Sequence, residues 1–387
     1  MISVLFVDSY PQVVAGQQET LTALLNACPG HGIAPVVAMP GHGVFADRLR
    51  AAGYPVEVLP QPDRIGAYGG AVYRYGLWGR VQMAGQVGGY VWRLRKWLKS
   101  RRFGAVYVND MRALLTFGLA ARSLGMPVLL WDKLDKPHGI YDALQLPLAS
   151  RNLMIAEAVC AKYPVWQRRL WRGKMSIVRN GIDLRQFQPA ERSLARARLG
   201  LDLRPKAVVM GIIGTICERK GHDRLIAAFA AAHGAQPDLT LLVIGTPEAE
   251  SEEFAARLRD QGQQNVHWLG RRDDMPAILP ALDFVVSPSR HEGMGRVNVE
   301  AMACGLPVIG AEGTGIAEVV VHGETGLLVD AGNVSALARA ILDLAGDPEL
   351  RLRMGRAGHR RARDVFDADR QISQVLTELG NLAARQS

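Results

Sequence analysis

Short apolar runs alternate with longer segments of helical character along the whole chain. The runs in the first half are Ile2 to Val7, Ala34 to Ala38, Val56 to Leu59, Ala105 to Val108 and Val128 to Trp131. Those in the second half are Ala207 to Ile213, Leu241 to Gly245, Val266 to Gly270 and Asp283 to Ser287. Uniformly apolar runs of this length are typical of strands buried on both faces of a parallel sheet. With helices between them, they predict an α/β fold built from doubly wound sheets.

Size, charge and cysteine usage narrow the class of protein. A chain of 387 residues with 48% hydrophobic content is long for one core, and two domains are expected. The net charge of +9 favours acidic partners such as nucleotide phosphates, anionic lipid headgroups or nucleic acid. Four scattered cysteines give neither a disulfide framework nor a zinc pattern, which favours a reducing cytoplasm. The first residues read as a strand rather than a signal peptide, and no apolar run approaches the ~20 residues of a membrane span.

The segment from Ser287 to Val308 carries the strongest functional signal. Pro288 ends a short apolar run, Gly293 and Gly295 lie where a helix should begin, and Gly305 lies where it should end. Glu292 is thus predicted in the loop after a buried strand, and Glu300 inside the next helix. Helix starts bind anions, and carboxylates accept hydrogen bonds from hydroxyls. The segment therefore predicts a site for a phosphorylated sugar or a nucleotide. The alternative is that Arg296 and Glu300, four residues apart, form only a surface ion pair.

The same segment resembles the Glu-x7-Glu signature of family 4 of the retaining glycosyltransferases, which have the GT-B fold of two Rossmann-like domains facing across a cleft. This resemblance implies that Glu292 and the backbone of Gly293, Met294 and Gly295 face the donor sugar. It also implies that Glu300 binds the ribose of the nucleotide. Residues 1–189 would form the acceptor-side domain, residues 190–363 the nucleotide-sugar domain, and residues 364–387 a helix crossing back to the first domain.

Other segments follow the family pattern with departures. Gly214 to His222 resembles the loop that grips the donor diphosphate, with Lys220 at the lysine position and Thr215 where arginine is usual. Arg219 is the candidate for the second cation.

By resemblance, the donor-binding residues also include Gly16, in the first glycine loop, Arg271, at the base-binding strand, and Arg296. His138 is the candidate for a first-domain histidine near the donor; the alternative is a solvated loop histidine.

Two segments combine tryptophan with cations. Tyr90 to Arg102 contains six cations and no acid, and Trp166 to Lys174 repeats the combination. They indicate either reversible contact with an anionic membrane, with Trp92 and Trp97 at the interface, or a solvated basic face. No nucleic-acid-binding motif is present.

We therefore expect a retaining hexosyltransferase that uses a nucleotide diphosphate sugar as donor and a glycan or lipid-linked acceptor in bacterial cell-surface polysaccharide or lipopolysaccharide synthesis. Glu292, Lys220 and His138 are the predicted catalytic residues. No metal and no cofactor is expected, and the protein is expected in the cytoplasm or on the inner face of the plasma membrane. The alternatives are a GT-B sugar-nucleotide epimerase and a non-catalytic nucleotide-sugar binding protein.

Overall fold

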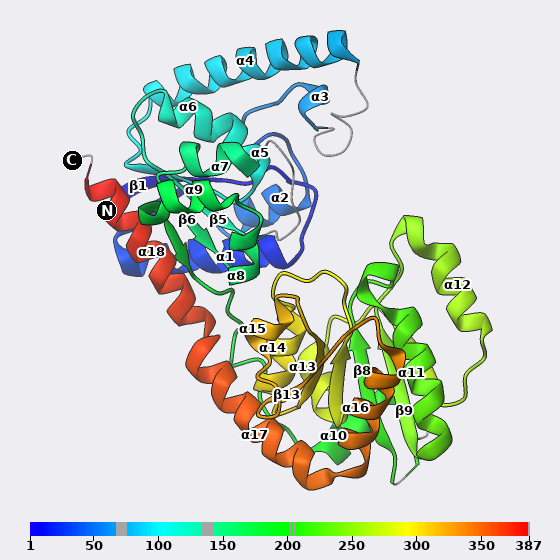
Figure 1. Cartoon of the computed structure of the whole chain (residues 1–387). Helices are drawn as coiled ribbons and strands as arrows, with labels where there is room; N and C mark the ends of the chain where they lie inside the picture. The colour runs from blue at the N-terminus through cyan, green and yellow to red at the C-terminus, as the bar shows by residue number, and fades with distance from the viewer. Residues whose placement is uncertain (67–75, 134–141, 202, 205, 386–387) are drawn as a thin grey trace. The chain divides into compact units, whose positions relative to one another are not determined.

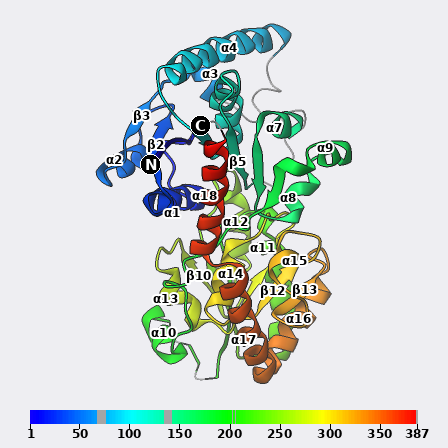
Figure 2. The same ribbon diagram turned by 90° about the vertical axis from the view of Figure 1, so that its left-hand side faces the viewer.

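The computed structural model describes residues 1–66, 76–133, 142–201, 203–204 and 206–385. The chain forms two compact units, coloured by residue number in Figures 1 and 2. Unit 1 comprises residues 1–155, 159–178 and 372–387, and unit 2 comprises residues 156–158 and 179–371.

Unit 1 is built on a seven-stranded parallel sheet with the order β3-β2-β1-β4-β5-β6-β7. Its strands are β1 (Ile2–Val7), β2 (Ile33–Met39), β3 (Val56–Val58), β4 (Ala105–Val108), β5 (Val128–Asp132), β6 (Arg151–Met154) and β7 (Met175–Ile177). The five apolar runs of the first half are all confirmed as strands. β6 was missed because its first two residues, Arg151 and Asn152, are polar, so the apolar residues that start at Leu153 did not mark a whole strand. Its place between β5 and β7 comes from tertiary pairing.

Helices cover both faces of this sheet because alternate strand residues point to opposite sides. They are α1 (Gly16–Ala27), α2 (Val44–Ala51), α3 (Asp63–Gly66), α4 (Leu77–Lys99), α5 (Met111–Ala113), α6 (Leu119–Arg122), α7 (Asp142–Leu148), α8 (Glu157–Ala161) and α9 (Val165–Leu170). On one face, Leu5 and Val7 of β1 join a buried cluster with Tyr90, Leu94 and Leu98 of α4. This cluster explains why the basic segment is a fixed helix of unit 1.

The packing of α4 corrects one sequence-based expectation. Trp97 packs against the buried cluster, with its ring centroid 5.8 Å from that of Phe103, so it does not point outward as a membrane anchor would. Trp92 is 58% exposed, and the Lys96 ammonium lies 4.6 Å above its ring. In the second basic segment, Lys174 donates to the carbonyls of Ala149 and Leu146, so this cation is also engaged within the unit.

The glycine of the first loop lies at a helix start. Gly16 was expected within the loop after β1, but α1 already begins at this residue. Ala15 is extended, and the Thr20 hydroxyl donates to the Gly16 carbonyl at 2.8 Å. Glu19 in the first turn suits the positive end of the helix. Gly16 is therefore the first residue of a helix.

Unit 2 is built on a six-stranded parallel sheet with the order β10-β9-β8-β11-β12-β13. Its strands are β8 (Val208–Ile213), β9 (Leu239–Ile244), β10 (Val266–Gly270), β11 (Phe284–Ser287), β12 (Val308–Ala311) and β13 (Gly326–Val329). The four predicted strands of the second half are confirmed. Its helices are α10 (Arg192–Leu199), α11 (His222–Ala235), α12 (Glu252–Asp260), α13 (Met275–Ile278), α14 (Arg296–Ala303), α15 (Ile316–Val319), α16 (Val334–Gly346) and α17 (Pro348–Val365). From Ile372 on, helix α18 (Ala368–Ala384) belongs to unit 1.

Both sheets reverse their strand order next to their first strand, between β1 and β4 in unit 1 and between β8 and β11 in unit 2. In open α/β sheets, ligands bind outside the carboxyl ends of the strands at such a reversal. In unit 2 the segments at this position are residues 214–222 after β8 and residues 288–295 after β11. The fold thus directs attention to the two segments that the sequence singled out.

Candidate active site

Lys220 and Glu292 meet at the carboxyl edge of the unit 2 sheet. Lys220 ends the short 3-10 helix η6 (Glu218–Lys220), and Glu292 lies in the loop between β11 and α14. The Lys220 ammonium donates to the Glu292 carboxylate, and both side chains are largely buried. The Arg219 guanidinium lies 3.9 Å from the same carboxylate and donates to the His291 carbonyl at 3.2 Å. Two cations and one carboxylate therefore share one site.

The loop that carries Glu292 is held by backbone contacts. The Gly315 N–H donates to the Glu292 carbonyl at 2.8 Å, and the Arg290 N–H donates to the Arg219 carbonyl at 2.8 Å. A Cβ atom on Gly315 would lie 1.8 Å from the Gly293 carbonyl oxygen, so only glycine permits this approach. These contacts join the loops after β8, β11 and β12 into one support for the Glu292 side chain.

Helix α14 begins directly beside this carboxylate. Its N-cap residue, Gly295, has φ +68°, which favours glycine, and no side chain caps the first turn. The first N–H groups of a helix lack intrahelical partners and carry partial positive charge. Met294 is 3% exposed, so its side chain belongs to the interior and any ligand contact would fall to its backbone.

Glu300 lies within α14 and is only 8% exposed. The Arg296 guanidinium lies 3.4 Å from its carboxylate, which confirms that these residues pair. Because Glu300 is buried, the pair is more than a solvated surface contact. Burial raises the pKa of Glu300, and the nearby Arg296 opposes that rise. A carboxylate in this environment accepts hydrogen bonds strongly.

The remaining predicted site residues lie at different places. Gly214 has φ +136°, and its Cβ position is 3.9 Å from the Lys220 nitrogen, so it belongs to the same site. Thr215 is exposed beside it. Arg271 follows β10, is exposed and pairs with Asp273 at 3.2 Å. Gly16 lies in unit 1, at the start of α1. His138 lies outside the described residues.

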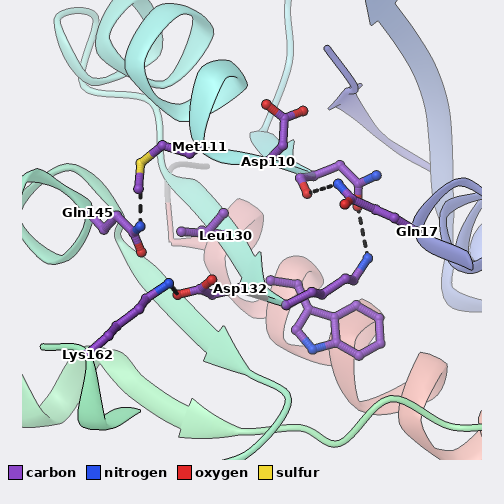
Figure 3. Close-up of a pocket in the computed structure, with 10 residues that line it drawn as sticks. Gln17, Asp110, Met111, Leu130, Asp132, Gln145 and Lys162 are labelled. Carbon is purple, nitrogen blue, oxygen red and sulfur yellow. Dashed lines mark hydrogen bonds and ion pairs between the residues drawn. The ribbon is translucent and has the colours of Figure 1, made fainter. Parts of the chain in front are cut away.

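Unit 1 has a polar pocket at the carboxyl ends of β4 and β5 that the sequence analysis did not identify (Figure 3). Gln17 reaches in from α1 and donates to the Asn109 carbonyl at 2.5 Å. The Lys133 ammonium donates to the Asn109 side chain at 3.0 Å. On the other side, Lys162 and Asp132 form an ion pair of 2.6 Å. The cavity measures about 20 Å³, which suffices for one water molecule.

Two carboxylates, Asp110 of the pocket lining and Asp8, lie close together. Asp8 accepts from the Asn109 amide at 2.7 Å, and Asp110 accepts from the Ser9 and Ala113 N–H groups at 2.9 Å each. Burial, followed by the charge of Asp8, raises the pKa of Asp110 to about 6. A signal for these residues existed in the sequence. Asp8, Asn109 and Asp132 each stand at or directly after the end of an apolar run.

Among the described residues, no group of three or more histidine, cysteine, aspartate or glutamate side chains is arranged to hold a metal ion. None of the described helices has the length and apolarity needed to cross a bilayer.

The two doubly wound parallel sheets, with a polar site at the carboxyl edge of each, define the GT-B class of folds. Residues 195–361, which lie within unit 2, match the model of the family described as glycosyl transferases group 1. The solved structure of Anabaena Alr3699/HepE in complex with UDP and glucose has the same fold. It superposes with a TM-score of 0.77 over 98% of this chain and 100% of that chain, at 23% identity.

Curated relatives match at higher sequence identity. The chain is 31% identical to a D-inositol 3-phosphate glycosyltransferase of Streptomyces avermitilis over 278 residues, covering 69% of this chain and 58% of the relative. It is 37% identical over 192 residues to a GDP-mannose-dependent monoacylated alpha-(1-6)-phosphatidylinositol monomannoside mannosyltransferase of Corynebacterium glutamicum, covering 46% and 49%. The chain thus spans about half the length of these two relatives.

Proposed function

We propose that the protein is a retaining glycosyltransferase of family 4 that transfers a hexose from a nucleotide diphosphate sugar. The single observation that carries this proposal is the meeting of Lys220, Arg219 and Glu292 beside the uncapped start of α14. Cations and the N–H groups of a helix start suit a diphosphate, and a carboxylate suits sugar hydroxyls. The family match of this segment and the names of the two curated relatives support the same activity.

The chemistry assigned to these residues is electrostatic. Lys220, Arg219 and the first N–H groups of α14 would stabilise the leaving diphosphate, whose negative charge increases as the glycosidic bond breaks. On donor binding, the Lys220 ammonium would exchange part of its contact with Glu292 for the phosphate. Glu292 would then orient the sugar and offset the positive charge at the anomeric carbon. Glu300 would accept hydrogen bonds from the ribose hydroxyls.

The acceptor side is proposed for unit 1. Gln17, Asn109 and Lys133 place amide groups and a cation at the carboxyl ends of its strands, where a hydroxylated acceptor would exchange for their mutual hydrogen bonds and for the water that the small cavity admits. The relatives are named for an inositol phosphate and for a phosphatidylinositol mannoside, so the acceptor panel should contain both chemistries. A lipid-linked acceptor in cell-surface polysaccharide or lipopolysaccharide synthesis fits a protein that visits the inner face of the plasma membrane.

The test begins with a thermal-shift screen of nucleotide diphosphates and their hexoses, followed by measurement of nucleotide release with and without acceptor. Release that requires the acceptor, with a product of the same anomeric configuration as the donor, is the expected result. Conversion of the donor sugar without acceptor would identify an epimerase instead. Donor binding with no turnover under any condition would identify a binding protein.

Substitution of the two glutamates should separate their roles. Glu292→Gln should lower kcat by at least about 100-fold, because the charge opposite the reacting centre is lost. Glu300→Gln should mainly raise the donor KM, by about tenfold, because it loses a charge-assisted hydrogen bond. Glu349→Gln, at an exposed glutamate in the first turn of α17, is the matched control and should change neither constant. Near-wild-type turnover of Glu292→Gln would contradict the donor-site assignment.

A further inference from the structure

Unit 2 contains a second cavity at the amino edge of its sheet. Pro280 lies four residues before β11, and Leu306 lies two residues before β12; both line the cavity. The Lys220–Glu292 cluster lies beyond the opposite, carboxyl ends of the strands. The four residues of β11 separate the two edges by about 13 Å, at roughly 3.3 Å per residue. The cavity is therefore separate from the proposed donor site.

The floor of this cavity is rigid because α17 packs closely against the turn that follows α14. A Cβ atom on Gly355 would lie 2.0 Å from the Gly305 carbonyl oxygen, and one on Gly358 would lie 3.2 Å from Met302. The His359 Nδ1 atom donates to the Ala303 carbonyl at 2.7 Å. These contacts fix the helix face whose side chains line the cavity.

The charge of the cavity is strongly positive. Arg192, Arg356, Arg360 and His359 line it, and no carboxylate does. The Asp283 carboxylate nearby pairs with Arg192 at 2.8 Å, but it also pairs with Arg196 at 2.6 Å. The hydrogen bond from His359 to the last turn of α14 explains why His359 lies here. No such contact explains Arg356 and Arg360, for which the described residues provide no ion pair.

The remaining lining is apolar. Pro189, Pro280, Leu306 and Leu352 contribute to it, and Leu352 is 48% exposed. The volume is about 420 Å³, within the range of small-molecule sites. Guanidinium groups match phosphate oxygens in two-pronged geometry, and an apolar wall suits a flat or aliphatic group next to the phosphate. Both features are combined in an organic phosphate ester.

We propose that this cavity, an open groove formed by α17, the start of α10 and the turn 304–306, binds an organic phosphate ester. Arg356 and Arg360 contact the phosphate, and Leu352 with the prolines contacts the attached apolar group. The ester is either a soluble metabolite or a lipid headgroup, since both present the same chemistry. Helix α14 joins the two sites, because its first turn adjoins Glu292 and its last turn leads into the groove.

Calorimetric titration with phenyl phosphate at low salt tests the site. Arg356→Gln/Arg360→Gln should weaken binding at least about tenfold, because both phosphate-binding forks are removed. Arg353→Gln/Arg363→Gln changes two exposed arginines of the same helix that do not line the groove, and should bind as wild type. Equal melting temperatures of the two variants would exclude a folding effect. Unchanged phenyl phosphate binding by Arg356→Gln/Arg360→Gln would overturn the proposal.

Three further measurements distinguish a soluble ligand from a lipid headgroup, and the groove from the proposed donor site. Inorganic phosphate should bind more weakly than phenyl phosphate, because it leaves the apolar wall unused; equal affinity would contradict the assigned ester class. Phosphatidylglycerol vesicles that retain wild type but not Arg356→Gln/Arg360→Gln would make the ligand a lipid headgroup. Lys220→Ala should leave the groove intact. If Lys220→Ala abolished phenyl phosphate binding, the ligand would occupy the donor site and the groove proposal would fail.

Discussion

Glu300 shows how much one side chain depends on its surroundings. In the sequence it is one of two glutamates in a motif, and its pairing with Arg296 could equally have been a solvated contact. Within α14 the carboxylate is almost fully buried, and burial raises its pKa while Arg296 opposes the rise. The desolvation of a buried ion pair can cost more than the attraction between its charges returns, so a functional reason for Glu300 is expected.

His222 carries a pH-dependent stability that can be measured. It begins α11, is 1% exposed, and burial lowers its pKa to about 4. Below about pH 6.5 the unfolded chain binds a proton that the folded protein excludes, so stability is lost as the pH falls toward 4.

The loss attributable to His222 should approach about 3 kcal/mol between pH 7 and pH 4. Urea unfolding of wild type and His222→Gln at pH 7.5 and pH 5 checks this. The variant should lose less stability than wild type between these two pH values. His31→Gln, at an exposed histidine, is the control and should follow wild type. An equal pH dependence of His222→Gln and wild type would contradict the buried neutral histidine.

At the scale of the element, close helix packing in unit 2 depends on single glycines. Gly355→Ala would place a methyl group against the Gly305 carbonyl, which the backbone of the turn cannot avoid. We expect a loss of about 1–3 kcal/mol in the free energy of unfolding from this overpacking. Gly234→Ala, inside α11 with open space around the added methyl group, should instead gain about 0.5–1 kcal/mol. Denaturant unfolding measures the change in the free energy of unfolding for both variants. Equal changes would contradict the close contact between Gly355 and the Gly305 carbonyl.

Helix α4 shows a division between its two faces. Tyr90, Leu94 and Leu98 hold it on the sheet, while Trp92, Arg93, Lys96 and Lys99 lie exposed. The apolar side chains that anchor α4 lie on the face that packs on the rest of unit 1, and these cations lie on the other face. The helix is therefore held in place by unit 1 itself and needs no membrane to form. A membrane role therefore depends on the exposed face alone.

At the scale of the molecule, this face predicts reversible membrane association. Wild type should co-sediment with anionic vesicles at low salt and less at high salt, because each cation near the surface contributes about 1 kcal/mol. Charge reversal at Arg93, Lys96 and Lys99 should release it without changing donor binding. Reversal of three exposed arginines of unit 2, Arg257, Arg339 and Arg353, is the matched control. Equal partitioning of wild type to anionic and neutral vesicles would leave α4 as a solvated helix.

The proposed chemistry also predicts activity without a divalent metal. Leaving-group charge is assigned to Lys220, Arg219 and the start of α14. Transfer should therefore persist in excess chelator, and Lys220→Ala should lower it at least about 100-fold. Assays with and without chelator on wild type measure this. Complete loss in chelator, restored by magnesium or manganese, would count against the assignment.

The sequence by itself determined most of the local structure. Mostly apolar runs identified nine of the thirteen strands described, and the glycines at 293, 295 and 305 located both ends of α14. The sequence could do this because strand burial and helix ends depend on neighbouring residues. Among the others, β6 was missed because its first residues, Arg151 and Asn152, are polar, and its place in the sheet follows from its pairing with β5.

Only the tertiary structure decided which distant side chains meet. Lys220 and Glu292 are 72 positions apart, and their ion pair requires β8 and β11 to be neighbours, an order that no local pattern encodes. The same holds for Asp132 and Lys162 in the unit 1 pocket, and for the arginines of α17 beside Pro189. Trp97 was misjudged for a related reason, since helical spacing does not say which neighbour covers a side chain. Periodicity fixes the face of an element, whereas sheet order and loop length fix what that face contacts.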